Sequence, residues 1–300
     1  EKFVLLSSSA GDKTRYHLMP IVPGVFEMAM VRTSLDTLTD WHRRFAELFS
    51  ALYDTGFFVD YTDHPVPFVR YLPVGETIEA HPQVLPSDRL EEVLDRYKVF
   101  AVALCQCRTA ERIVGRGCDR PLENCVVFGN VAGLLIHHGK MRRAERAEVL
   151  EIKTQAAAAG LANFVSEMET RRIDGGAACS CCGCCCGALR TISQFNAPGL
   201  IAPPHFLPQV DLTSCTYCGR CASACPVGAT VVDAEGKLYQ HLPERCIGCG
   251  LCAVACDREH AIQMEPTPKY REPPRGLLSI LLQIVPNHLR NAWSVWRKHR

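Results

Sequence analysis

Two short stretches of regularly spaced cysteines carry the clearest chemistry in this 300-residue chain. They read CTYCGRCASACP and CIGCGLCAVAC, and both follow the spacing C-x2-C-x2-C-x3-C. Three thiolates on a tight loop can bind three corners of an iron–sulfur cubane, while the fourth cysteine reaches a neighbouring cubane. The spacing therefore predicts two [4Fe-4S] clusters. The first is expected on Cys215, Cys218, Cys221 and Cys256, and the second on Cys246, Cys249, Cys252 and Cys225.

Zinc ribbons are the alternative interpretation of such C-x2-C pairs. Zinc usually takes its ligands two at a time from separate knuckles, whereas each stretch here offers three cysteines and then a fourth. Gly219, Gly248 and Gly250 would also let the backbone come close to cluster sulfides. The pattern therefore favours iron–sulfur clusters. It departs from the usual form at Asp257, where a proline commonly follows the last cysteine.

Four further cysteines follow an apolar segment, residues 99–104, that we expect to be a strand. Their spacing is C-x-C-x10-C-x6-C, and four thiolates can hold one complete cluster. Arg108 and Arg112 would balance the negative charge of these thiolates and raise the cluster potential. The four are Cys105, Cys107, Cys118 and Cys125.

The stretch CSCCGCCCG contains six more cysteines within eight positions. Neighbouring side chains in such a run point in different directions, so all six cannot bind one small ion, but they can bridge two centres. We expect the run to share the ligation of up to two further clusters with the preceding four cysteines, which makes up to four clusters in all. The six are Cys179, Cys181, Cys182, Cys184, Cys185 and Cys186.

Three other uses of this run are considered. A disulfide scaffold is disfavoured because vicinal cysteines pair with strain and the sequence has no visible export signal. A zinc site or thiolate store is a second possibility. The two CCG triplets also resemble those of heterodisulfide reductase catalytic subunits, which hold unusual clusters that cleave disulfides, but the rest of that pattern is missing.

The cysteine patterns resemble two known families. Residues 208–266 closely resemble dicluster ferredoxin domains, and this implies clusters that transfer single electrons. The C-x-C-R motif, the CCxCCC run and the ferredoxin motif together resemble a family of uncharacterised anaerobic 4Fe-4S binding proteins over most of residues 99–260. That resemblance implies [4Fe-4S] clusters and electron transfer. The partners of the protein do not follow from it.

The elements that must position these cysteines indicate an α+β protein. We expect an N-terminal docking domain at 1–98, helical and winged-helix-like, then a cysteine-rich iron–sulfur domain at 99–207. The dicluster ferredoxin domain would span 208–266, and a proline-rich tether with an amphipathic helix would span 267–300. Helices are predicted at 36–54, 87–97 and 141–159, strands around a turn at 56–73, and a hairpin turn at Glu235 and Gly236. The predicted apolar face of the first helix comprises Leu38, Trp41, Phe45, Leu48, Phe49 and Leu52.

Composition and net charge limit the classes of function that this chain can have. An apolar fraction of 47% describes a folded chain, and a net charge of +1 gives no general case for nucleic-acid binding. An iron–sulfur sensor that binds DNA stays an alternative because of the winged-helix-like region, but the mixed charges on helix 36–54 disfavour it. No nucleotide-binding glycine motif is present, so a partner chain would supply the catalytic chemistry.

The C-terminal segment predicts attachment to a larger structure. The apolar run 277–285 is too short to cross a bilayer, while Trp293 and Trp296 with basic neighbours suit an interfacial helix at an anionic membrane. Packing into a partner subunit is an equal alternative.

The sequence thus predicts a cytoplasmic, anaerobic electron-transfer subunit that can associate with the cytoplasmic face of a membrane as a peripheral protein. It would relay single electrons between a redox enzyme partner and a membrane-side or soluble acceptor. No residue is assigned a catalytic role. The rival prediction is a catalytic oxidoreductase whose central cluster binds a substrate such as a disulfide or a quinone-like molecule.

Overall fold

The computed structural model describes residues 5–10, 13–18, 24–57, 59, 69–79, 81–169, 174–199, 201–268 and 270–272. The expected tail helix at 277–300 lies outside these residues, as does most of the expected strand–turn–strand at 56–73. Among the residues that are described, no helix has the length and hydropathy needed to cross a membrane.

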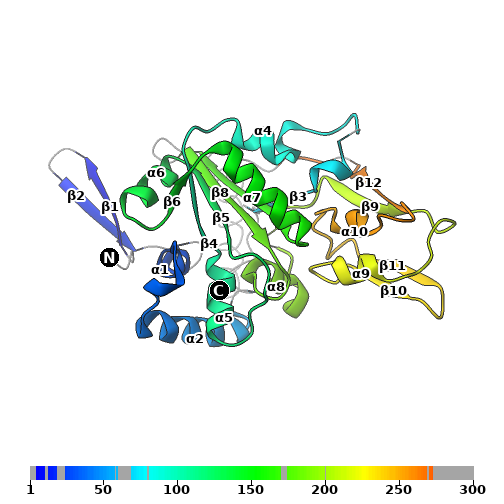
Figure 1. Cartoon of the computed structure of the whole chain (residues 1–300), viewed down its shortest axis with the longest axis horizontal. Coiled ribbons are helices and arrows are strands. Elements are labelled where there is room, and N and C mark those ends of the chain that lie inside the picture. The colour runs from blue at the N-terminus through cyan, green and yellow to red at the C-terminus, as the bar shows by residue number, and fades with distance from the viewer. Residues whose placement is uncertain are drawn as a thin grey trace, which may run out of the picture.

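A six-stranded, entirely antiparallel sheet forms the centre of the molecule (Figure 1). Its strands lie in the order β3-β7-β8-β5-β4-β6, which differs strongly from their order in the chain. Sequence neighbours β7 and β8 pair with each other, and β8 also pairs with β5. The strands are β3 (Arg70–Leu72), β4 (Phe100–Leu104), β5 (Glu123–Gly129), β6 (Arg142–Ala144), β7 (Ala162–Glu169) and β8 (Asp174–Cys181).

Helices cover both faces of this sheet, and β4 reflects this in its uninterrupted apolar sequence, FAVAL. Phe100 and Val102 pack on one side with residues of α4 (Leu90–Leu94) and α7 (Arg146–Ala158). Ala101 and Ala103 pack on the other side with residues of α6 (Asn130–His137). Because alternate residues of a strand point to opposite faces, a strand covered on both sides is apolar throughout.

Two of the predicted helices are only partly helical. The segment 87–97 forms a 3-10 turn at Pro86–Asp88 and then α4, and the segment 141–159 begins with β6 before α7. Residues Arg142–Ala144 pair with β4 instead of extending α7. This pairing satisfies the backbone groups on the free side of β4, which would otherwise be a sheet edge.

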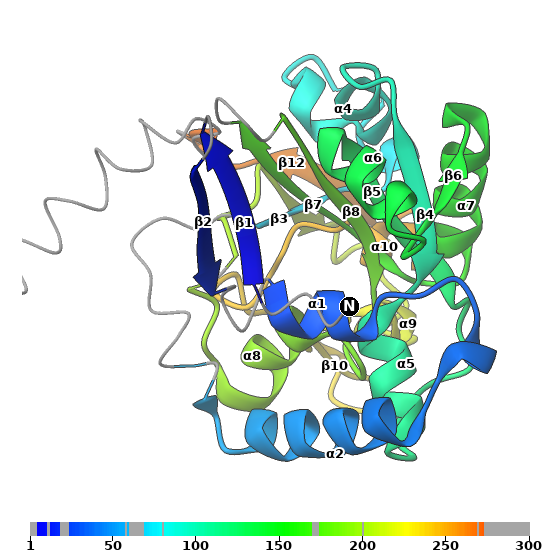
Figure 2. The same cartoon turned by 90° about the vertical axis from the view of Figure 1, so that its left-hand side faces the viewer.

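Four helices gather beside one end of the sheet (Figure 2): α1 (Phe26–Met30), α2 (Asp40–Asp54), α5 (Gln106–Ile113) and α8 (Gly187–Phe195). Helix α5 starts directly after β4, and α8 starts directly after the cysteine run, which begins within β8. The two strands thus bring both upstream cysteine segments to the same end of the sheet. The chain also has an N-terminal hairpin of β1 (Leu5–Ala10) and β2 (Lys13–Leu18), and 3-10 turns at Leu35–Thr37 and Gly75–Thr77.

The predicted apolar face of α2 is wrong in part. Leu48 is 54% exposed and Leu52 is 38% exposed, whereas the buried residues of the helix are Ala46, Ser50 and Tyr53. The physical reason lies in what α2 packs against. Its neighbour α5 presents the carboxylate of Glu111, which is buried and accepts a hydrogen bond from Ser50, so this side of α2 needs polar groups.

The C-terminal part is a small domain with two matching halves, seen at the right of Figure 1. Strand β9 (Phe206–Val210) pairs antiparallel with β12 (Ile262–Pro266), and the expected hairpin is formed by β10 (Thr230–Asp233) and β11 (Leu238–His241). Each cysteine-rich loop is followed by one short helix, α9 (Arg220–Ala224) or α10 (Leu251–Ala255).

This C-terminal domain packs directly on the cysteine run of the central sheet. One apolar cluster contains Cys181 and Cys186 from the run together with Cys249 from the domain. The amide of Val74 also donates a hydrogen bond of 3.1 Å to the carbonyl of Cys249. The thiols of the two regions therefore share one buried interface.

Candidate iron–sulfur centres

The loops of the C-terminal domain are shaped to surround a cofactor. Gly219 and Gly250 immediately precede the short helices and have φ angles of 77° and 74°. Few residues other than glycine adopt this conformation without strain. The sharp turn that it produces lets the cysteines on either side of each glycine face a common space.

The two sets of four cysteines line two separate cavities, each of about 20 Å³. Cys225, which belongs to the first sequence motif, lines the second cavity, and Cys256 from the second motif lines the first. This crossed arrangement is the one that the spacing predicted. The first cavity is lined by Cys215, Cys218, Cys221 and Cys256, and the second by Cys225, Cys246, Cys249 and Cys252.

Backbone amides already point at sulfur in both cavities. Ala229 donates its amide to the Sγ of Cys225 at 3.1 Å, and Tyr217 donates to the Sγ of Cys215 at 3.4 Å. Burial raises the pKa of Cys246 to about 11, so its thiol is protonated at neutral pH unless a metal displaces the proton. Donors aimed at sulfur and a set of four thiols around each cavity fit a [4Fe-4S] cluster there.

Asp257, the departure from the usual proline, has a structural role. It forms an ion pair with Arg220, which also lies 2.5 Å from the Glu259 carboxylate. Arg220 Nε donates to the Sγ of Cys218 at 3.4 Å, and this hydrogen bond lowers the pKa of Cys218. Because Cys218 is exposed, the first cavity lies near the protein surface, and a cation held by two carboxylates marks that surface.

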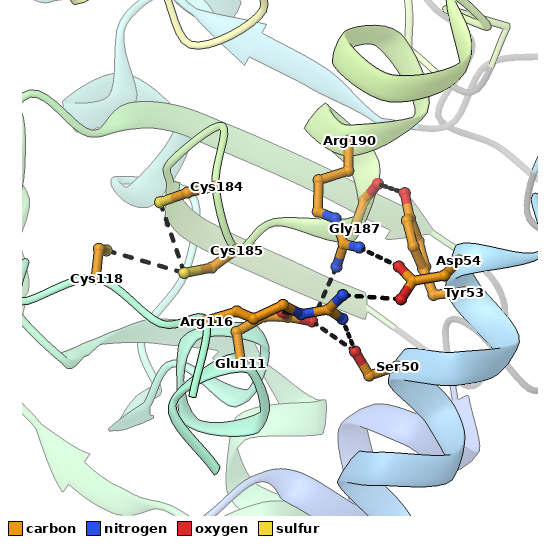
Figure 3. A network of polar contacts seen from close by, with 10 residues as sticks. All are labelled: Ser50, Tyr53, Asp54, Glu111, Arg116, Cys118, Cys184, Cys185, Gly187 and Arg190. Carbon is orange, nitrogen blue, oxygen red and sulfur yellow. Dashed lines mark hydrogen bonds and ion pairs between the residues drawn. The ribbon is translucent and has the colours of Figure 1, made fainter. Parts of the chain in front are cut away.

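Nine of the ten upstream cysteines fall into two groups, and the first is compact. The Sγ atoms of Cys118, Cys182, Cys184 and Cys185 all lie within 4.8 Å of one another. Figure 3 shows Cys118 and Cys184 pointing toward Cys185 from different loops. The hydrogen bond from Cys185 and the guanidinium of Arg108 hold the pKa of Cys182 well below its usual range. Cys182 thus carries negative charge readily, whereas its neighbourhood raises the pKa of Cys184 and of Cys185.

The second group lines a cavity of about 140 Å³ between the sheet and the four helices. Cys186 is central to it, because Cys107 and Cys181 both form hydrogen bonds with this thiol and the hydroxyl of Tyr71 lies 3.8 Å from its Sγ. Three aromatic side chains complete much of the apolar lining: Phe26, Phe49 and Phe164. The lining cysteines of this group are Cys105, Cys107, Cys179, Cys181 and Cys186.

The structure therefore separates the four cysteines of the C-x-C-x10-C-x6-C motif. Cys105 and Cys107 face the cavity, while Cys118 joins three cysteines of the run in the compact group. Cys125 is buried on β5 and forms a hydrogen bond with Cys179. The six cysteines of the run are likewise divided between the two groups, with Cys182 and Cys185 lying between them at the cavity wall.

Two buried cations lie beneath these thiols. Arg108 is fully buried and its Nη2 lies 3.4 Å from the Sγ of Cys182. Burial opposes its charge, but the thiolates of Cys105 and Cys182 outweigh that effect and raise its pKa. Lys153, buried under β5 and β8, donates to the carbonyls of Asn124 and Ala178 and to the Ser180 hydroxyl.

Neither cation forms an ion pair with a carboxylate in the described part of the chain. An uncompensated buried charge costs several kcal/mol. Burial lowers the pKa of Lys153, and nearby sulfur such as that of Cys179 opposes this effect. Both side chains are therefore stable as cations here if the nearby sulfur is anionic. This observation fits metal-bound thiolates. Sequence reasoning found Arg108 but missed Lys153, since one lysine in a helix gives no signal. Arg112, the other predicted charge partner, is exposed and bonds the carbonyls of Cys118 and Arg120.

A network of charged side chains closes the helical side of the cavity (Figure 3). Arg190 of α8 binds Glu111 of α5 and Asp54 of α2, each at 2.8 Å. Arg116 pairs with the same two carboxylates, and the Tyr53 hydroxyl donates to the carbonyl of Gly187. The network fixes three helices around the cavity. Its residues are far apart in the sequence, so no local pattern predicts it.

Comparison with known proteins identifies the C-terminal domain. Residues 207–257 match the model of a 4Fe-4S dicluster domain. An uncharacterized ferredoxin of Methanocaldococcus jannaschii is 34% identical over 65 residues, which are 21% of this chain and 84% of that protein. No solved structure is significantly similar.

Two further relatives are named as parts of redox systems. The thiosulfate reductase electron transfer subunit of Salmonella typhi is 34% identical over 90 residues, 26% of this chain and 45% of that subunit. The iron-sulfur cluster-binding subunit of a menaquinone reductase from Nitratidesulfovibrio vulgaris is 43% identical over 44 residues, 14% of this chain and 17% of that subunit. The chain thus spans less than half the length of either subunit.

These matches confirm the ferredoxin domain that the cysteine spacing predicted, and they agree with the two cysteine-lined cavities. The dicluster domain and its two cysteine-lined cavities show a protein that binds multiple [4Fe-4S] clusters. Through its C-terminal domain, the chain belongs to the ferredoxin-like proteins with two [4Fe-4S] clusters.

Proposed function

We propose that this chain is an electron-transfer subunit in which single electrons pass among three [4Fe-4S] clusters. Two clusters occupy the ferredoxin cavities, with the ligands that line them. The third is held in the large central cavity by thiols of its second cysteine group, with Cys105, Cys107, Cys181 and Cys186 as the ligand candidates. Ferredoxin-type clusters transfer electrons without making or breaking bonds in a substrate, so the chemistry resides in a partner.

The observation that carries this proposal is the apolar cluster shared by the two regions. Cys181 and Cys186 of the central cavity pack in it together with Cys249 of the second ferredoxin cavity. Cys225 and Cys246, which also line the second ferredoxin cavity, lie against the same cluster. A central cluster would therefore lie next to the second ferredoxin cluster, with no aqueous layer between them.

The exposure of the thiols indicates which end of the electron path lies closest to solvent. Cys249 is buried, whereas Cys218 of the first ferredoxin cavity is exposed. Electrons would thus enter or leave through the first cluster, beside Arg220, Asp257 and Glu259. A redox partner would dock on that surface.

The partner is a catalytic redox enzyme of a larger complex. Relatives named as electron transfer and cluster-binding subunits of a thiosulfate reductase and a menaquinone reductase support this role. The acceptor is membrane-side or free in solution, and segment 277–300 would provide the membrane or partner contact. This proposal for the segment rests on its sequence, which combines an apolar run with tryptophans and basic residues.

Analysis of acid-labile sulfide in the anaerobically purified chain tests the third cluster. Three cubanes give about twelve sulfides per chain, four for each. Substitution of Cys186→Ser should remove about four of them, because Cys186 is the thiol that the others of the cavity contact. A matched control, Ser193→Ala in α8, should retain all twelve. A wild-type chain with about eight sulfides would contradict the proposal.

A second candidate function is favoured by the size of the central cavity. The ferredoxin cavities measure about 20 Å³ each, and the central one about 140 Å³. Space remains beside a cubane for a small apolar substrate, and Glu27, whose pKa burial raises to about 6, could exchange a proton there. A disulfide that perturbs the EPR signal of the reduced central cluster would support this catalytic role, and an unchanged signal would oppose it.

A further inference from the structure

The compact sulfur group has a geometry that differs from that of the cluster cavities. Its Sγ–Sγ distances are 3.7 Å for Cys118–Cys182, 3.7 Å for Cys184–Cys185 and 3.9 Å for Cys118–Cys185. A tetrahedral zinc ion with Zn–S bonds of about 2.3 Å holds its ligands about 3.8 Å apart. The four thiols thus already have the spacing of ligands around one metal ion.

A cubane would require a wider arrangement. Each of its four thiolates binds a different iron atom, so the sulfurs are separated by the width of the iron–sulfide core. The ferredoxin domain of the same structure provides the comparison. Its eight thiols, all of which are described, surround two open cavities and form no compact group. The compact group leaves no comparable space between its sulfur atoms.

The surroundings of the group match the charge of a single-ion site. Four thiolates around a divalent ion have a net charge of −2, and the fully buried guanidinium of Arg108 lies 3.4 Å from the Sγ of Cys182. Arg108 also donates to the carbonyls of Pro121 and Ser180, which fixes its position. Such a cation next to a ligand sulfur offsets part of the negative charge.

The backbone holds the ligands on two tied loops. The amide of Cys186 donates to the carbonyl of Cys182 at 3.1 Å, which closes the turn that carries Cys184 and Cys185. Arg112 donates to the carbonyls of Cys118 and Arg120, which fixes the other loop. A metal ion would join these two loops, which are about sixty residues apart in the chain.

We propose that Cys118, Cys182, Cys184 and Cys185 form a mononuclear tetrathiolate site for one thiophilic divalent ion, Zn²⁺ or Fe²⁺, instead of ligating a [4Fe-4S] cluster. The ion has a structural role. It ties the turn between Cys182 and Cys186 to the loop that carries Cys118. This site does not depend on the third cluster of the proposed electron path.

Metal and sulfide analysis of the full anaerobically purified chain tests the site. The wild-type protein should hold about one zinc, or about one iron in excess of its sulfide, per chain. Substitution of Cys184→Ser, the exposed ligand, should remove that ion and leave the sulfide content unchanged. In a control, Cys218→Ser should lower iron and sulfide of a ferredoxin cluster and leave the single ion in place. Loss of about four irons and four sulfides from Cys184→Ser would overturn the proposal.

X-ray absorption of the wild-type protein gives a test that needs no variant. If the ion is zinc, the extended fine structure beyond the zinc absorption edge should show four sulfur neighbours at about 2.3 Å and no nearby iron. If the ion is iron, the oxidised protein should show the EPR signal of an isolated high-spin ferric ion in a sulfur environment. A chain that holds neither zinc nor iron in excess of sulfide would contradict the site.

Discussion

The backbone of Gly183, in the middle of the cysteine run, lies against the carbonyl oxygen of Pro226 in the ferredoxin domain. A Cβ added at Gly183 would be only 2.0 Å from that oxygen. Pro226 follows Cys225, which lines the second ferredoxin cavity. The glycine is thus required by the close approach of the two sulfur-rich regions.

This contact predicts the effect of Gly183→Ala. The new methyl group must push the run away from Pro226, and such overpacking costs about 1–3 kcal/mol. We expect a lower thermal midpoint and a weaker magnetic interaction between the central cluster and the second ferredoxin cluster in EPR spectra. Gly133→Ala in α6 is the control, since nothing lies within 4 Å of its added Cβ. Equal behaviour of the two variants would show that the contact is unimportant.

The crossed cavities predict which cysteines act together. Cys225→Ser should remove the EPR signal of the same cluster as Cys246→Ser, although Cys225 belongs to the other sequence motif. Cys256→Ser should instead match Cys215→Ser. EPR spectra of the four reduced variants check this pairing. If Cys225→Ser affected the cluster of Cys215, the crossed assignment would be wrong.

The buried guanidinium of Arg108 predicts a specific electrostatic effect. Arg108→Met removes the cation between Cys105 and Cys182, so the reduction potential of the central cluster should fall, because reduction adds negative charge. The protein should also lose about 3–5 kcal/mol of stability, as is typical when one partner of a buried charge pair is removed. Redox titration followed by EPR measures the first effect, and thermal unfolding under anaerobic conditions the second.

Arg112→Met is the matched control for that experiment. Arg112 is exposed and its donors bind the carbonyls of Cys118 and Arg120 rather than sulfur. In Arg112→Met we expect the reduction potential of the central cluster to stay close to that of the wild-type protein. A shift of the same size in both variants would indicate a general effect of net charge.

Glu27 predicts a dependence of stability on pH. Its carboxylate accepts the amide of Gly24 at 2.6 Å, and burial raises its pKa from 4.5 to about 6. The folded protein therefore binds this proton more tightly than the unfolded chain. This contribution is fully present below about pH 4.5 and is lost as the pH rises through 6.

Glu27→Gln should remove that dependence and raise the stability at pH 7 by about 1–2 kcal/mol. Thermal midpoints between pH 4.5 and 7.5 measure the change. Glu47→Gln, an exposed residue paired with Arg44, serves as the control and should leave the pH profile unaltered. If the thermal midpoint of Glu27→Gln fell with rising pH as steeply as that of the wild type, Glu27 would not be the source of the pH dependence.

The ferredoxin part could be predicted from sequence because its information is local. Each motif carries three ligands within seven residues, and the fourth ligand follows after three more positions. The spacing alone therefore predicts the loop, the cluster and the crossed ligand. The apolar run at 99–104 likewise predicted β4, since a strand covered on both faces needs no polar positions.

The arrangement of the upstream cysteines depends on contacts between distant segments. Cys118 meets Cys182 because β8 pairs with β5 and β7, and this brings the run beside the loop before β5. Neither the strand order nor Lys153 beneath it can be inferred from spacing. The face of α2 was mispredicted for a similar reason, because the buried charges of Glu111 and Arg190 reverse the usual preference for apolar partners.

The most direct test of the electron path is a coulometric reductive titration of the intact, anaerobically purified chain, followed by EPR. Each [4Fe-4S] cluster accepts one electron, so three clusters predict about three electrons per chain and interacting paramagnetic signals. Uptake of about two electrons, with signals from the ferredoxin domain alone, would contradict a central cluster and with it the proposed path.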